Sequence, residues 1–249
     1  MKIISLVPSI TETLLDLGVE SLVGRTKFCI HPRDKVSEIP IVGGTKNIKI
    51  DFIKSLQPDL IIANKEENVK EQVELLMEDF PVWVTDIETL QDNNAFLKEV
   101  GDTFHKEKEA KVYIEQTQQV FKDLPIADVS LKVAYLIWRN PYMSVGRDTY
   151  IHEILTHLNL ENICKNLTRY PQIEMKDLEK ADVILLSTEP YPFSEKHFEE
   201  FQNVFPNKKT IIVDGEVFSW YGTHLAKSKG YLRKLANQLL QISTEGNLY

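Results

Sequence analysis

The stretch from Leu90 to Leu124 constrains the fold of this chain more than any other part of the sequence. It contains no Pro and one Gly, and apolar residues recur along it at spacings near three, four or seven, which predicts an amphipathic helix. A break is expected where Gly101 meets the charged run 105–109, giving a shorter helix and then a long one from about Lys106 to Leu124. At about 1.5 Å per residue the second helix would span roughly 25 to 30 Å. We therefore expect a helical strut, 90–124, between two lobes.

The segments on either side of this strut, 1–89 and 125–249, each alternate short apolar runs with amphipathic segments. Such alternation indicates a parallel sheet covered by helices on both faces, so we predict an α/β chain with two Rossmann-like lobes. Ser9 or Thr11 is expected to cap the first helix. The predicted strands are Lys2–Val7, Ser21–Gly24, Pro58–Ala63, Pro81–Val84, Leu131–Trp138, Ala181–Ser187 and Thr210–Val213, and the predicted helices include Glu66–Met77 and Thr223–Leu240.

Composition excludes some partners. The formal net charge of -8 and a pI near 5.4 disfavour nucleic acid, because phosphate binding needs clustered Lys and Arg. No apolar run approaches the length that crosses a membrane, so we expect a protein that is not membrane-embedded. We also expect a monomer. Cys29 and Cys164 are expected to be free thiols.

The first residues, MKIISLVPSITETLL, lack the long apolar run of a signal peptide. We expect the chain as it stands to stay in the cytoplasm, and to act in the periplasm or at the cell surface if an export signal has been removed.

Motifs for catalysis are missing from the sequence. It has no GxSxG, HExxH, Walker A or GxGxxG pattern, and its six histidines do not pair at metal-ligand spacing. His152 and His157 lie five apart, on different faces of a helix, so we interpret the histidines as surface residues and predict no metal site. The pairs Glu66–Glu67 and Glu199–Glu200 are interpreted as solvated helix charges. The expected function is therefore not enzymatic.

Large aromatic residues follow several predicted strands. They lie in loops, where an aromatic ring is less easily explained as core. Ligands of parallel sheets bind at the carboxyl ends of strands, so together these residues favour an inter-lobe cleft for a broad, partly apolar ligand. Packing within a lobe remains an alternative for each one. The residues are Phe28, Trp138 with Arg139, Tyr142, Tyr170, Tyr191 and Trp220 with Tyr221.

Four segments resemble a known family, the helical-backbone binding proteins of ABC transporters, and its cobalamin-binding members most of all. They are IISLVPSITETLLDLG, LVGRTKFCIHP, VGGTKNIKIDFIKSLQPDLIIA and YMSVGRDTYIHEILTHLNLENIC, and the likeness runs from Lys2 to about Leu240. The resemblance implies two α/β lobes joined by one rigid helix. It also implies a metal-chelate ligand in the cleft, namely a corrinoid, haem or ferric siderophore, with no cofactor of the protein's own and little closure on binding.

Site residues follow from the resemblance position by position. A loop aromatic contacts the ligand at Phe28 in the first lobe and at Tyr142 in the second, while Gly44 and Thr45 replace an aromatic that some relatives have. Docking to an ABC permease would use one surface Glu per lobe. The implied ligand-binding set is Pro8, Ser9, Phe28, Gly44, Thr45, Arg139, Tyr142, Tyr170, Trp220 and Tyr221, and the docking candidates are Glu71 in the first lobe and Glu195 or Glu199 in the second.

Two alternatives stay open at the level of sequence. One is an enzyme or accessory protein that handles a corrinoid or tetrapyrrole, with His31 or Glu66 as acid or base. The other is a module that has lost its ligand and binds a partner protein. The scaffold itself does not name the ligand, because binders of different chelates differ only in loop residues.

Overall fold

The computed structural model describes residues 1–246, which divide into two compact units. Unit 1 contains Met1–Ile87, Gln91–Thr117 and Trp220–Ala226, and unit 2 contains Glu88–Leu90, Gln118–Ser219 and residues 227–246. Most of the predicted strut therefore packs with unit 1. Residues 220–226, which the sequence assigns to the second lobe, also pack with unit 1, so the chain passes between the units more than once.

Unit 1 is built on a four-stranded parallel sheet in the order β2-β1-β3-β4. Ile4 of β1 pairs with Ile61 of β3, and Ile61 pairs with Val82 of β4. The central strands are buried apolar runs, as expected for a parallel sheet with both faces covered. The strands are β1 (Ile3–Ser5), β2 (Leu22–Arg25), β3 (Leu60–Asn64) and β4 (Val82–Thr85), and the helices are α1 (Pro8–Asp16), α2 (Arg33–Val36), α3 (Ile50–Leu56) and α4 (Lys70–Met77).

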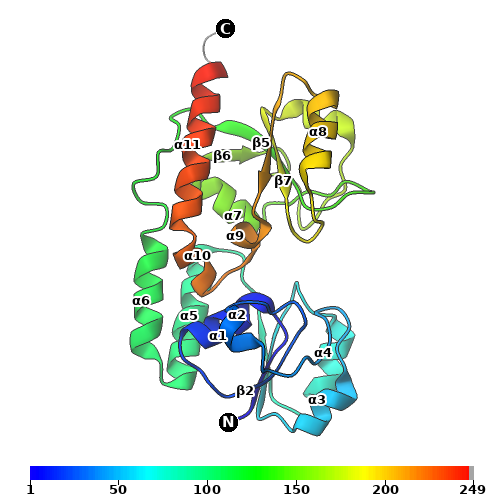
Figure 1. Cartoon of the computed structure of the whole chain (residues 1–249), viewed down its shortest axis with the longest axis vertical. Helices are drawn as coiled ribbons and strands as arrows, with labels where there is room; N and C mark the ends of the chain where they lie inside the picture. The colour runs from blue at the N-terminus through cyan, green and yellow to red at the C-terminus, as the bar shows by residue number, and fades with distance from the viewer. Residues whose placement is uncertain (247–249) are drawn as a thin grey trace. The chain divides into compact units, whose positions relative to one another are not determined.

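The predicted strut is a helical hairpin in unit 1, formed by α5 (Leu90–Phe104) and α6 (Glu107–Gln118), which lie side by side (Figure 1). His105 adopts a left-handed backbone, and the amide of Lys106 donates to the carbonyl of Gly101 at 2.8 Å, which ends α5. A Cβ at Gly101 would lie 2.7 Å from the Cβ of Ala110, so only glycine allows this approach. The break is near the predicted place.

The prediction of a long second helix to Leu124 is wrong. Helix α6 ends at Gln118, and α5 is the longer of the two. Beyond this end Val120 is fully buried, and the ring of Phe121 stacks on His157 of unit 2 with centroids 4.8 Å apart. These apolar residues fit a helical stripe in the sequence, but tertiary packing takes them out of the helix.

Unit 2 repeats the sheet topology of unit 1, in the order β6-β5-β7-β8. Strand β6 was not predicted because it is only three residues long and holds a charged residue. The predicted closing helix Thr223–Leu240 is two helices, since it is interrupted at Ser228. The strands are β5 (Leu131–Leu136), β6 (Leu160–Asn162), β7 (Val183–Ser187) and β8 (Lys209–Val213), and the helices are α7 (Tyr150–His157), η1 (Met175–Lys180), α8 (Glu195–Val204), α9 (Gly215–Ser219), α10 (Thr223–Lys227) and α11 (Lys229–Gly246).

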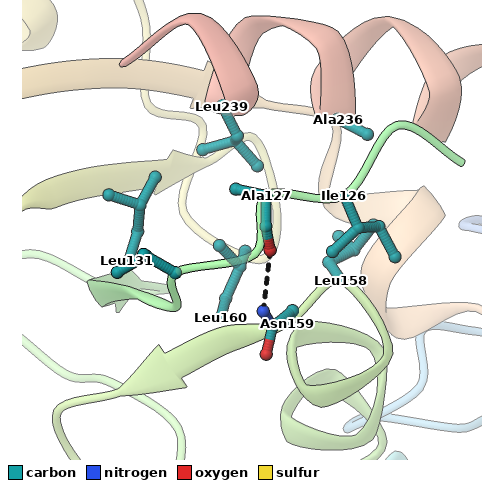
Figure 2. A pocket seen from close by; sticks show the side chains of 9 residues that line it. Ile126, Ala127, Leu131, Leu158, Asn159, Leu160, Ala236 and Leu239 are labelled. Carbon is teal, nitrogen blue, oxygen red and sulfur yellow. Dashed lines mark hydrogen bonds between the residues drawn. The ribbon is translucent and has the colours of Figure 1, made fainter. Parts of the chain in front are cut away.

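Helix α11 packs against the edge of this sheet (Figure 2). Apolar side chains from α11, β5 and β6 surround a cavity of about 10 Å³, room for a single water at most. Beside it, the side-chain amide of Asn159 donates to the carbonyl of Ala127 at 2.9 Å. The cavity is therefore a detail of packing and not a ligand site.

The first helix begins without the predicted side-chain cap. Val7 is the N-cap residue and Pro8 is the first helical residue, where a missing amide costs nothing. Thr11 lies inside the helix, and its hydroxyl donates to the carbonyl of Val7 at 3.0 Å and to the hydroxyl of Ser5 at 2.8 Å.

Within the described part of the chain, none of the helices has the length and apolar character needed to cross a membrane.

Candidate ligand-binding surfaces of the two units

Each sheet reverses its strand order between its first and third strands, which are β1 and β3 in unit 1 and β5 and β7 in unit 2. In open α/β sheets, ligands bind beyond the carboxyl ends of the strands at such a switch point. The loops after these four strands are therefore the candidate binding surface of each unit. Each unit's surface is described separately below.

In unit 1, Asn64 at the end of β3 organises the loops. Its side-chain amide donates to the carbonyl and hydroxyl of Thr85 at the end of β4, both at 3.1 Å. Its carbonyl oxygen accepts from the backbone amides of Glu66 at 2.8 Å and Glu67 at 3.2 Å. One buried side chain thus fixes the ends of two adjacent strands and the turn that follows.

The prediction that Glu66 and Glu67 are solvated helix charges is wrong. Helix α4 begins at Lys70, so both residues lie in the turn after β3, and both are half-buried. Burial raises the pKa of the Glu67 carboxyl, an effect that Lys46 partly opposes. The error arose because a polar turn directly before a helix resembles the helix's first turn.

The predicted residues Phe28, Gly44 and Thr45 come together in unit 1. The ring of Phe28 is half exposed, and a Cβ at Gly44 would lie 3.4 Å from it. The carbonyl of Thr45 accepts from the side-chain amide of Asn68 at 3.1 Å, and that amide also donates to the carbonyl of Leu6 after β1. The turn 43–45 is therefore tied to the end of β1, and the exposed ring of Phe28, from the loop after β2, lies beside this turn.

The segment 220–226 is bound to unit 1 by polar contacts. The amide of Gly222 donates to the Asn93 side chain at 2.5 Å, and the hydroxyl of Thr223 donates to Asp16 at 2.5 Å. Gly222 has a φ of 75°, and a Cβ there would collide with the hydroxyl of Thr13. Only glycine fits this close approach.

The predicted residues Trp220 and Tyr221 are both buried, and their rings contact different neighbours. Tyr221 is buried, with its ring edge-on to Phe96 at 5.6 Å and its hydroxyl 3.3 Å from that of Thr85. Burial raises the pKa of Tyr221, and hydrogen bonds with Thr85, Ser9 and Asn64 oppose the rise. The structure thus gives Tyr221 a packing role. Pro8 and Ser9 are likewise buried, at the start of α1.

Trp220 lies between two histidines of unit 1. Its ring is 5.6 Å from that of His31 and 5.2 Å from that of His224, measured between centroids. Nδ1 of His224 is 2.8 Å from Oε2 of Glu12, a carboxylate buried in α1. Neither Glu12 nor Asn64 was identified from sequence. The sequence signal for Asn64 was a polar run, Asn64 to Asn68, placed directly after a buried strand.

In unit 2 the switch-point loops carry Trp138, Arg139, Tyr142 and Tyr191. The ring of Trp138 is exposed and meets Tyr191 edge-on at 5.8 Å. The guanidinium of Arg139 donates to Glu200 of α8 at 2.7 Å and lies beside the hydroxyls of Tyr142 and Tyr191. Tyr142 and Tyr191 are half-buried and pack against the hydrophobic core of unit 2. Each ring therefore belongs partly to the candidate binding surface and partly to the core.

The interpretation of all six histidines as surface residues is wrong for His197, which is buried in α8. Its Nδ1 accepts from the backbone amide of Ser194 at 3.1 Å, and its Nε2 lies 3.1 Å from the hydroxyl of Tyr191. Burial lowers the pKa of His197, and the nearby Lys196 and Arg139 lower it further.

Tyr170 is the remaining aromatic residue predicted for the ligand site. It follows Arg169 in the chain, and its side chain is exposed.

The predicted docking residues lie on equivalent helices. Helix α4 links the third and fourth strands of unit 1, and α8 does so in unit 2. Glu71 and Glu195 are both exposed in the first turns of these helices, whereas Glu199 lies a turn further on. Glu71 and Glu195 therefore occupy equivalent positions in the shared topology.

The potential metal ligands and the two thiols are described within residues 1–246. This part of the chain holds no cluster of three or more His, Cys, Asp or Glu side chains that could bind an ion. Cys29 and Cys164 are buried free thiols. Burial raises the pKa of both, and hydrogen bonds oppose the rise, from Thr11 and Thr26 at Cys29 and from Ser144 at Cys164.

Two parallel sheets of the same strand order, one in each unit, are typical of a bilobed binding-protein fold. The model of the periplasmic binding protein family matches residues 3–205, so the chain belongs to that family. The resemblance found in the sequence is thereby confirmed.

Individual relatives narrow the comparison. The chain is 24% identical over 200 residues to a vitamin B12-binding protein of Vibrio parahaemolyticus, covering 78% of this chain and 72% of the relative. It is 24% identical over 188 residues to the uncharacterized ABC transporter substrate-binding lipoprotein YvrC of Bacillus subtilis, covering 69% of this chain and 58% of that one.

Solved structures share the fold. The periplasmic vitamin B12 binding protein BtuF of Vibrio cholerae superposes with a TM-score of 0.77 at 18% identity, over 95% of this chain and 97% of that one. The periplasmic haem-binding protein HutB of Vibrio cholerae gives a TM-score of 0.78 at 21% identity, over 94% of this chain and 98% of that one.

Proposed function

We propose that this protein binds a corrinoid or a related metal chelate and delivers it to an ABC-type importer without transforming it. The observation that carries the proposal is the exposed ring of Phe28, in the loop after β2, beside the turn that contains Gly44. An aromatic face at the carboxyl edge of a parallel sheet suits a broad, flat, partly apolar ligand.

The relatives support the ligand class. Several are vitamin B12-binding proteins, and the fold is shared with haem-binding proteins. In unit 2, the exposed Trp138 and the guanidinium of Arg139 offer a second aromatic and a positive charge. The ligand cleft between the lobes stays a prediction of the sequence.

Direct titration tests the proposal. Purified protein is titrated with cobalamin, cobinamide, haem and ferric siderophores, and binding is followed by calorimetry. We expect Trp220→Ala to weaken binding of the preferred chelate by about 1 to 3 kcal/mol, the usual range for a buried aromatic contact. Absence of binding to every one of these ligands would refute the proposal.

A matched pair of variants separates the site from the general surface. Phe28 and Phe52 are both exposed phenylalanines of unit 1, but Phe52 lies on α3, which leads into the amino end of β3. Phe28→Ala should weaken chelate binding, and Phe52→Ala should leave it unchanged. Equal losses in the two variants would remove the argument for the switch-point surface.

Docking to the importer follows from equivalent positions. We propose that Glu71 and Glu195, exposed on the equivalent helices α4 and α8, meet basic residues of a permease. Reversing both charges with Glu71→Lys and Glu195→Lys should abolish stimulation of a reconstituted transporter while chelate affinity stays unchanged.

A further inference from the structure

Glu67 places a carboxyl group on the candidate binding surface of unit 1. It lies in the turn after β3, one of the two strands at the switch point, and its backbone amide donates to the side chain of Asn64 at 3.2 Å. The next residue, Asn68, donates at 3.1 Å to the carbonyl of Thr45, in the turn that lies beside Phe28. The turn with Glu67 and the loop with the exposed ring are therefore joined to the same neighbouring turn.

The neighbours of the Glu67 carboxyl show where it lies. Burial raises the pKa of this carboxyl, and the charge of Lys46, whose ammonium donates to the carbonyl of Glu66 at 2.6 Å, opposes the rise. Burial also raises the pKa of Tyr221, and the charge of Glu67 adds to that rise. The hydroxyl of Tyr221 is 3.3 Å from that of Thr85 at the end of β4. The carboxyl is therefore near the ends of β3 and β4, where ligands of parallel sheets bind.

The carboxyl of Glu67 has no hydrogen-bond or ion-pair partner among residues 1–246. The side chain is half-buried, and both of its oxygens stay open to solvent. Such a carboxylate is costly, because it loses water without gaining a hydrogen bond. A carboxylate only accepts hydrogen bonds, so the group that compensates it is a donor such as a primary amide. A carboxylate on the ligand would instead be repelled.

We propose that Glu67 determines ligand specificity in unit 1 by accepting hydrogen bonds from amide groups on the periphery of the bound chelate. The site then favours chelates that carry primary amides, as corrinoids do, over chelates that carry carboxylates, as haem does. The positive charge of Lys46 is already nearby, so a neutral donor suits the position better than a second cation. The inference rests on the proposed function and deepens it, because it names the side groups that the surface prefers.

The test compares two corrinoids that share a ring and differ in their side groups. Dicyanocobinamide carries amides around the ring, and dicyanocobyrinic acid carries carboxylates in their place. We expect the full-length protein to bind the amide form at least about tenfold more tightly in calorimetry at neutral pH. Glu67→Gln keeps the shape of the side chain, removes its charge and adds a donor. The ratio of the two dissociation constants should therefore fall at least about fivefold, mainly through tighter binding of the carboxylate form.

A matched control removes the same charge elsewhere on unit 1. Glu20 is exposed just before β2, at the amino edge of the sheet. Glu20→Gln should leave the ratio as it is in the unmodified protein, which separates a local effect from the net charge of -8. Glu67→Gln retains the backbone amide that donates to Asn64, so thermal unfolding of both variants should match that of the unmodified protein.

Three results would overturn the inference. One is an unchanged ratio in Glu67→Gln, and another is a proportional loss of both affinities, as expected if Glu67 only supports the turn. The third is equal binding of the two corrinoids by the unmodified protein. In each case a corrinoid still binds, so the proposed binding function stands and only the contact of Glu67 fails. If neither corrinoid, haem nor a ferric siderophore binds, the binding function fails as well.

Discussion

Replacement of Asn64 by alanine should destabilise unit 1 far more than an ordinary change at a strand end. Besides its contact with Tyr221, the side chain makes four hydrogen bonds, two to Thr85 and two from the amides of Glu66 and Glu67. After the change the carbonyl of Thr85 keeps a bond from the amide of Lys65, but neither Glu amide retains its acceptor. Hydrogen bonds contribute about 0.5 to 1.5 kcal/mol each, so we expect a loss of about 3 kcal/mol in the free energy of unfolding.

The neighbouring Lys65 offers a matched control. Its ion pair with Asp86 is half exposed, so Lys65→Ala should cost less than about 0.5 kcal/mol. Both variants are compared by urea denaturation followed by far-UV circular dichroism. Hydrogen exchange of peptides that span residues 61–68 then shows whether the amides of Glu66 and Glu67 lose protection.

The outcome can refute the reasoning directly. If Asn64→Ala costs no more than Lys65→Ala, and exchange at residues 66 and 67 is unchanged, then Asn64 does not organise the strand ends. The turn after β3 would have to be held by its own backbone.

Two further predictions concern backbone strain and pH. Gly222→Ala should destabilise the protein by at least about 1 to 2 kcal/mol, because alanine is strained at φ of 75° and its Cβ would meet Thr13; Gly230→Ala, with no atom within 4 Å of the added Cβ, should be neutral or slightly stabilising in thermal unfolding. Burial lowers the pKa of His197 below its unfolded value of about 6.5, so its contribution to stability is complete above that pH and is lost as the pH falls below it. Stability measured by urea at pH 7 and pH 5 should therefore fall on acidification, and by a smaller amount in His197→Asn; an equal fall in both proteins would contradict the assignment.

Much of the architecture followed from apolar runs in the sequence. Segments such as Pro58–Ala63 and Ala181–Ser187 were predicted as buried strands, and they are β3 and β7. A strand buried on both faces needs continuous apolar residues, so its pattern is visible in the sequence. Strand β6 was not predicted, because its three residues form a strand by pairing with the edge of β5 and not through a pattern of their own.

Helix ends depended on tertiary packing. The apolar stripe continued through Val120 and Phe121, so the sequence predicted a helix to Leu124, yet Val120 is buried beyond the end of α6 and Phe121 stacks on His157 of unit 2. Helical periodicity records which residues avoid water, but it does not record which neighbour covers them. The distinction decides where the helix stops.

By itself the sequence determined the α/β class, the two strand-and-helix successions and the loops that carry aromatic residues, because burial and turn formation are local preferences written into neighbouring residues. Only the tertiary structure decided which of these residues come together. Glu12 and His224 are in contact although they are 212 positions apart in the sequence. Asn64 at the end of β3 donates a hydrogen bond to Thr85 at the end of the adjacent β4. Contacts of this kind depend on how the chain returns on itself, since a hydrogen bond between distant residues leaves no periodic trace in the sequence.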